Sequence, residues 1–130
     1  MKQETDVSVW VGNIASEDAL REYVELDYSD DSAPLKSPFT EESGIDPDDI
    51  DEDFIESVFR DAPSDDLAVL LADCSYADAV TDACTALRGK SLPAAYNAVI
   101  LIYHYHHKPK APLRKSAFQW IGSVRIAYDN

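Results

Sequence analysis

The chain has 130 residues, of which 45% are hydrophobic, and a formal net charge of −14 at pH 7. This length predicts a single domain over residues 1–130, and the apolar fraction argues against global disorder. The sequence contains no apolar run of about 18 residues and begins without the apolar segment of a signal peptide, so we expect a cytoplasmic protein with no membrane span. Cys74 and Cys84 lack metal-ligand spacing and are expected to be buried thiols.

A strand is predicted over residues 5–12, where valines alternate with polar residues and Trp10. After a break at Gly12, Ser16 is suited to cap the N-terminus of a helix. Apolar residues three and four positions apart extend this helix to about residue 25.

The next segment, residues 27–48, is rich in Ser, Pro, Asp and Gly and predicts a long acidic loop, with a helical turn at residues 39–42. Five apolar residues between Ile50 and Phe59 have the spacing of a helix that ends before Pro63. A strand over residues 54–59 is the alternative interpretation of the same residues.

Two helices and two strands are predicted in the rest of the chain. A short helix follows residue 65, and a longer one is capped by Ser75 and ends at Gly89. The segment 99–105 is apolar on both faces and predicts a central strand. The segment 118–128 predicts a strand with a bulge at Gly122, antiparallel to the strand before it. Its main face would carry Phe118, Trp120, Val124, Ile126 and Tyr128.

This order of elements predicts an α+β domain. We expect a small mixed or antiparallel β-sheet of about three to five strands, packed by three or four helices that form a single layer.

The charge is distributed unevenly along the chain. Residues 1–82 contain 24 acidic and four basic residues, whereas residues 83–130 contain one acidic and seven basic residues. The acidic part would repel nucleic acid and anionic lipid and would attract a basic protein. We therefore expect no direct binding of nucleic acid or membrane, although solubility alone also favours exposed carboxylates.

Six acidic residues lie between Asp46 and Asp53, and Glu56 follows them. An EF-hand that began at Asp49 would need Gly at position 6 and Glu at position 12, where the chain has Phe54 and Arg60, so this calcium loop is excluded. Aromatic residues surrounded by charge are typical of protein interfaces, in which apolar anchors have a charged rim. The same aromatic residues would equally suit the core beneath a long loop.

The three histidines all lie in the segment 104–107. On a continuous strand His104 and His106 would share a face and could supply two ligands of a metal site, which makes a small metal-dependent enzyme the alternative hypothesis. The other interpretation is a strand end with histidines stacked on aromatic rings. Because the sequence has no nucleophile elbow, P-loop or H-E-x-x-H motif, we expect neither catalytic residues nor a cofactor.

Four segments of the chain occur in an order that resembles a known family. They are VSVWVGNIAS, IDEDFIES, CSYADA and NAVILIYHY. Together they are similar to the immunity protein 22 family, small bacterial proteins of polymorphic toxin systems, over residues 7–128. The segments Trp10–Asn13 and Asp51–Phe54 carry most of this resemblance. It implies an α+β fold, no enzymatic activity, and the binding and blocking of a toxin domain made by the same cell.

The acidic surface fits this hypothesis, because nucleases bind polyanions and tend to have basic clefts. The expected partner is thus a cognate toxin domain, a basic protein for which a nuclease is the expected class. The alternative is an acidic adaptor or nucleic-acid mimic that binds another basic protein. The segment Asp51–Phe54 could instead cap a turn or a helix. The predicted partner-binding residues are Asp46, Asp48, Asp49, Asp51, Glu52, Asp53, Glu56, Phe54, Tyr28, Phe39, Asp30 and Asp31.

Overall fold

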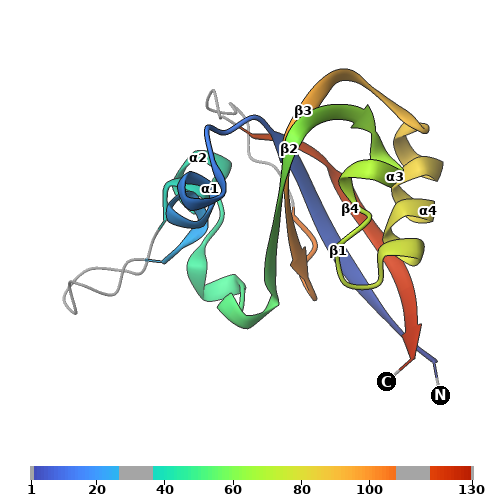
Figure 1. Ribbon diagram of the computed structural model, residues 1–130. Helices are drawn as coiled ribbons and strands as arrows, with labels where there is room; N and C mark the ends of the chain where they lie inside the picture. Colours follow the sequence, from blue (N-terminus) through green and yellow to red (C-terminus); the bar gives the residue numbers. More distant parts are fainter. Residues whose placement is uncertain (1, 27–36, 108–117, 130) are drawn as a thin grey trace.

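The computed structural model describes residues 2–26, 37–107 and 118–129 (Figure 1). Within these ranges no helix is long and apolar enough to cross a membrane. The elements in chain order are β1 (Lys2–Gly12), α1 (Glu17–Val24), α2 (Pro38–Ser43), η1 (Pro47–Asp49), η2 (Glu52–Phe54), β2 (Ile55–Asp66), α3 (Leu67–Leu70), α4 (Ala77–Arg88), β3 (Ser91–Tyr103) and β4 (Phe118–Asp129).

The four strands form one antiparallel sheet in the order β2-β3-β1-β4, which confirms the predicted α+β class. The predicted pairing of the last two strands with each other is wrong, because β1 lies between them. Val7 of β1 is opposite Tyr103 of β3 on one side and opposite Val124 of β4 on the other. A central position suits β1, since its valines and Trp10 are buried on opposite faces.

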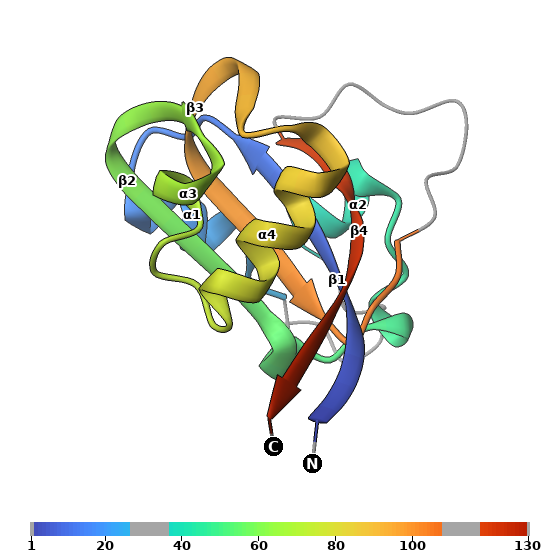
Figure 2. The same ribbon diagram turned by 90° about the vertical axis from the view of Figure 1, so that its right-hand side faces the viewer.

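The helices cover both faces of the sheet and do not form the single layer that we expected (Figures 1 and 2). α3 and α4 lie over one face and α1 and α2 over the other. Two faces are covered because β1 and β3 are apolar on both sides, and an apolar sheet face must be buried against another layer. In β3, Val99 and Leu101 belong to the α3–α4 core, whereas Ile100 and Ile102 belong to the α1–α2 core.

β2 replaces the helix that we predicted over residues 50–59, and the strand alternative is confirmed. Ile55 and Phe59 pack into the α1–α2 core, and Val58 packs into the α3–α4 core. Because both faces of this strand are covered, apolar residues occur at both odd and even positions. Their resulting spacing in the sequence resembled that of a helix.

The predicted bulge in β4 is confirmed beside Gly122. Val9 pairs with Gly122 and the next residue, Trp10, pairs with Trp120, so Ile121 is the additional residue of β4. The extra residue reverses the alternation of side chains. Phe118 and Trp120 therefore pack on the α1–α2 side, whereas Val124 and Ile126 pack on the opposite side, and the single face expected for these residues is not formed.

The helix termini agree only partly with the sequence. Ser16 caps α1 as predicted, because its hydroxyl accepts a hydrogen bond from the Ala19 N–H at 3.0 Å. The helical turn expected near residues 39–42 is the helix α2, which Ser37 and Thr40 cap reciprocally. Ser75, however, does not cap α4, because its N–H and hydroxyl bind Glu56 instead.

Candidate functional site

The acidic run forms the two 3-10 turns η1 and η2 between α2 and β2. The buried Ile45 and the half-buried Ile50 attach these turns to the α1–α2 core. Two carboxylates stabilise the turns themselves: Asp46 Oδ1 accepts a hydrogen bond from the Asp48 N–H at 2.9 Å, and Asp51 Oδ1 accepts one from the Asp53 N–H at 2.9 Å. The capping role considered for the Asp51–Phe54 segment is thus present at Asp51.

Asp48, Asp49 and Asp53 remain as exposed carboxylates of the run. Their side chains form no hydrogen bond or ion pair with the described part of the chain. Burial is the main cause that raises the pKa of the nearby Tyr105 hydroxyl, and the negative charges of Asp49 and Asp46 raise it further. The Glu52 side chain and the predicted contact residues Tyr28, Asp30 and Asp31 lie outside the described residues.

Glu56 connects three parts of the fold and is not a free surface charge. Its carboxylate accepts hydrogen bonds from the Ser75 N–H at 2.8 Å, the Ser75 hydroxyl at 3.2 Å and the Tyr103 hydroxyl at 2.7 Å. Burial and then this hydrogen bond raise the pKa of Tyr103 far above its usual range, so the hydroxyl remains a donor at neutral pH. Glu56 thereby holds the start of β2 against the end of β3 and the segment before α4.

The two phenylalanines of the predicted contact set have different environments. Phe39 of α2 is fully buried, and its ring meets Trp10 edge-on at 5.0 Å, so it cannot be an exposed anchor. Phe54, at the end of η2, is exposed and packs edge-on against the His104 ring at 4.5 Å. Only Phe54 of these two is accessible to a partner.

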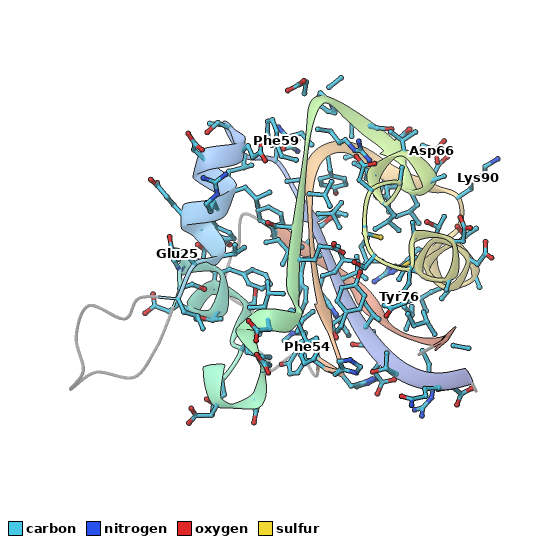
Figure 3. All side chains as sticks on the ribbon, turned by 60° about the horizontal axis from the view of Figure 1, so that its bottom comes forward. Glu25, Phe54, Phe59, Asp66, Tyr76 and Lys90 are labelled. Atoms are coloured by element: carbon cyan, nitrogen blue, oxygen red, sulfur yellow. The ribbon has the colours of Figure 1, made fainter. Side chains whose placement is uncertain are left out.

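Tyr76 is an exposed aromatic residue that the sequence did not identify as a contact candidate. It lies immediately before α4 (Figure 3). Its ring centroid is 6.1 Å from that of Tyr103. The available signal was the segment CSYADA, in which an aromatic residue precedes a predicted helix. This pattern does not reveal exposure, because an aromatic residue at a helix start can equally face the core.

The histidines do not form the shared face that a metal site would need. β3 ends at Tyr103, and the His104 Nδ1 lies 2.6 Å from the Thr5 hydroxyl, while the His106 Nδ1 lies 3.9 Å from Asp6 Oδ2. Thr5 and Asp6 are consecutive in β1 and therefore point to opposite faces. Among the described residues, no group of three or more His, Cys, Asp and Glu is arranged to hold a metal ion.

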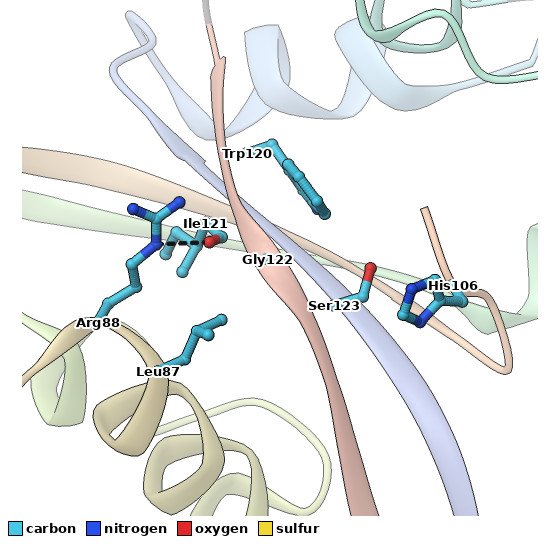
Figure 4. A pocket seen from close by; sticks show the side chains of 7 residues that line it. All are labelled: Leu87, Arg88, His106, Trp120, Ile121, Gly122 and Ser123. Carbon is cyan, nitrogen blue, oxygen red and sulfur yellow. Dashed lines mark hydrogen bonds between the residues drawn. The ribbon is translucent and has the colours of Figure 1, made fainter. Parts of the chain in front are cut away.

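A groove of about 340 Å³ runs between α4 and β4 (Figure 4). At one side the Arg88 Nε donates a hydrogen bond to the Ile121 carbonyl at 2.7 Å. At the other side Ser123 is engaged in the sheet, because its hydroxyl lies 2.8 Å from the Ser8 hydroxyl and accepts a bond from the His107 N–H at 3.0 Å. The side chains of the groove therefore support β4 and do not form an activated nucleophile. Its lining residues are Leu87, Arg88, His106, Trp120, Ile121, Gly122 and Ser123.

The two cysteines are buried and not joined by a disulfide, as the sequence predicts. Burial, followed by the charge of Glu56, raises the pKa of Cys74 to about 11, and burial raises that of Cys84 to about 12. Both thiols are therefore protonated at neutral pH, which makes them poor nucleophiles.

Comparison with known proteins matches this chain to a family model. The family model described as immunity protein 22 covers residues 7–128. Neither the curated proteins nor the solved structures that were searched contain a match. Immunity proteins are generally non-enzymatic, and membership suggests a role in neutralising a cognate toxin. Because the match extends over nearly the whole chain, the protein belongs to the immunity protein 22 family.

Proposed function

We propose that this protein neutralises a cognate toxin domain, with the turns η1 and η2 binding a basic face of that domain. The observation that carries the proposal is the set of exposed carboxylates on Asp48, Asp49 and Asp53. They are presented by a segment held by two side-chain caps, by the buried Ile45 and by the half-buried Ile50, so their backbone is ordered before the partner arrives.

The chemistry of these carboxylates suits a nuclease as the toxin. A nuclease binds the phosphates of its substrate through basic groups, and carboxylates on a protein inhibitor can occupy the same positions. Exposed carboxylates also attract a basic partner over a distance and raise the association rate by about 10–10³-fold at low salt. Rapid capture would protect the cytoplasm of a cell that makes the toxin.

The first experiment tests neutralisation itself. The C-terminal domain encoded by the large neighbouring open reading frame is expressed with and without this protein. We expect growth arrest by the domain alone, restored growth on co-expression, and a complex that co-purifies. Continued toxicity in the presence of soluble immunity protein would contradict the proposal, whereas capture of a different basic protein would favour the adaptor alternative.

The second experiment tests the acidic turns. The variant Asp48→Lys, Asp49→Lys, Asp53→Lys is compared with the control Asp61→Lys, Asp65→Lys, Asp82→Lys, which changes the net charge equally at exposed positions elsewhere. We expect the first variant to lower the association rate at least about tenfold at low salt, and the control to lower it less. Equal effects of both variants on the rate would show that the total charge, and not the turns, guides association.

A further inference from the structure

Two exposed aromatic rings lie at the same end of the sheet, where β3 finishes. Among the described residues, the large apolar side chains with the greatest exposure are Phe54 at 40%, Val69 at 45%, Tyr76 at 49% and Leu87 at 52%. Tyr76 packs against Tyr103, the last residue of β3, and Phe54 packs against His104, the residue that follows it. Figure 3 shows the positions of Phe54 and Tyr76. We call Phe54 and Tyr76 the aromatic pair.

The aromatic pair is held on a rigid support. The Glu56 carboxylate binds both Ser75, which precedes Tyr76, and the hydroxyl of Tyr103. The Tyr103 hydroxyl also lies 2.8 Å from the Ser75 carbonyl. β2, β3 and the segment before α4 are thus joined beneath the two rings, so a partner would find them already positioned.

The backbone beneath the aromatic pair is strained. Among the described residues, the non-glycine residues with positive φ are Tyr76 at 55° and His104 at 60°. The conformation of His104 allows its N–H and that of Tyr105 to converge on the Asp6 carbonyl, at 2.8 and 3.3 Å. Tyr76, in the same left-handed conformation, occupies the N-cap position of α4 and forms no side-chain cap there, while the preceding Ser75 binds Glu56. Such strain tends to cluster at binding and catalytic sites, where it is retained for function.

Charge beside the aromatic pair indicates the chemistry of the partner. Asp53 is exposed and adjoins Phe54 in the chain. An aromatic face with neighbouring carboxylates suits the guanidinium group of Arg or the ammonium group of Lys, which can stack on the ring and pair with the acid. We propose that the aromatic pair is the anchor of the toxin interface and receives Arg or Lys side chains of the toxin domain.

This inference rests on the proposed function and adds the residues that hold the partner. Electrostatic attraction by the carboxylates of η1 and η2 would set the association rate, whereas the rings of the aromatic pair, once covered by the partner, would mainly slow dissociation. Substitutions of the carboxylates should therefore change mainly the association rate, and substitutions of the aromatic pair should change mainly the dissociation rate.

The test measures dissociation of a catalytically inactive toxin domain from the immunity protein. Phe54→Ala and Tyr76→Ala are compared with Leu87→Ala and Val69→Ala, which remove equally exposed apolar groups from other positions. We expect each aromatic variant to raise the dissociation rate at least about tenfold, and each control to change it less than about threefold. The domain is the one that the wild-type protein neutralises in the co-expression experiment.

A further variant separates binding from folding. Asn adopts the left-handed conformation more readily than Tyr, so Tyr76→Asn should raise the melting temperature while it weakens the complex. If the wild-type protein binds the domain and all variants bind equally well, the aromatic pair is not the anchor, although the proposed function stands. If the wild-type protein binds no toxin domain, the proposed function fails together with this inference.

Discussion

His107 is a buried imidazole among aromatic rings after the end of β3. Its ring centroid lies 5.1 Å from that of Trp10 and 5.2 Å from that of Trp120. The backbone N–H of His107 donates to the Ser8 hydroxyl at 2.9 Å, which ties the segment after β3 to the central strand. Burial, followed by the charge of His106, lowers the pKa of His107 below its ordinary value of 6.5.

This lowered pKa predicts a loss of stability in acid. Below about pH 6.5 the unfolded chain protonates His107 while the folded protein does not, so unfolding becomes more favourable until the pH reaches the folded pKa. Above that window the effect is absent. His107→Gln should therefore reduce the loss of unfolding free energy between pH 7 and pH 5, measured by urea denaturation. The carboxylates are the same in the wild-type protein and in His107→Gln, so their titration does not affect the comparison. If the unfolding free energies of the two proteins fall in parallel between pH 7 and pH 5, the prediction is wrong.

At the scale of the element, α2 shows how a short helix positions the candidate site. Six residues are too few for a helix that is stable alone, so its stability comes from capping and packing. Ser37 and Thr40 cap its start, Gly44 ends it in the left-handed conformation at φ 69°, and Phe39 packs against Trp10. The acidic turns begin directly after this helix and depend on its position.

Phe39→Ala should therefore destabilise the fold, whereas Phe54→Ala should not. Removal of a fully buried Phe costs about 3–5 kcal/mol of unfolding free energy, while truncation of the exposed Phe54 should cost less than about 1 kcal/mol. Chemical denaturation of both variants measures the difference. A Phe39→Ala protein of normal stability that no longer binds toxin would reverse our assignment and make Phe39 a contact residue.

The elements that the sequence predicted correctly have strong local patterns. β1 and α1 combine a clear period with a cap or break, and β3 is a long apolar run. β2 was mistaken for a helix because residues with helical spacing become a strand only when β3 supplies the hydrogen-bond partners. The N-terminus of α4 was mistaken because Glu56, 19 residues away from Ser75 in the chain, takes the hydroxyl that would have capped it.

At the scale of the whole molecule, a net charge of −14 opposes compaction. Like charges repel one another more strongly in the folded state than in the expanded chain, and salt screens this repulsion. The same salt also screens the attraction between this protein and a basic partner. Stability and association should therefore respond to ionic strength in opposite directions.

We expect the melting temperature to rise when NaCl is increased from about 10 to 150 mM, because the Debye length falls from about 30 to about 8 Å. The association rate with the toxin domain should fall over the same range. Thermal denaturation and stopped-flow mixing measure the two quantities. The Asp48→Lys, Asp49→Lys, Asp53→Lys variant carries less negative charge, and its melting temperature should depend less on salt; a salt-independent melting temperature of the wild-type protein would contradict the prediction.

Composition and local periodicity by themselves determined the α+β class, the apolar strands and the uneven charge, since each can be read from neighbouring residues. The resemblance to immunity proteins rests on four particular segments of the sequence and their order. The tertiary structure decided which of these residues a partner can reach. Phe39 and Phe54 have similar acidic neighbours in the chain, yet one is buried and the other exposed. Glu56 belongs to the acidic region but binds Ser75 and Tyr103. Exposure and hydrogen-bond partners depend on segments that are distant in the chain, and only packing brings those segments together.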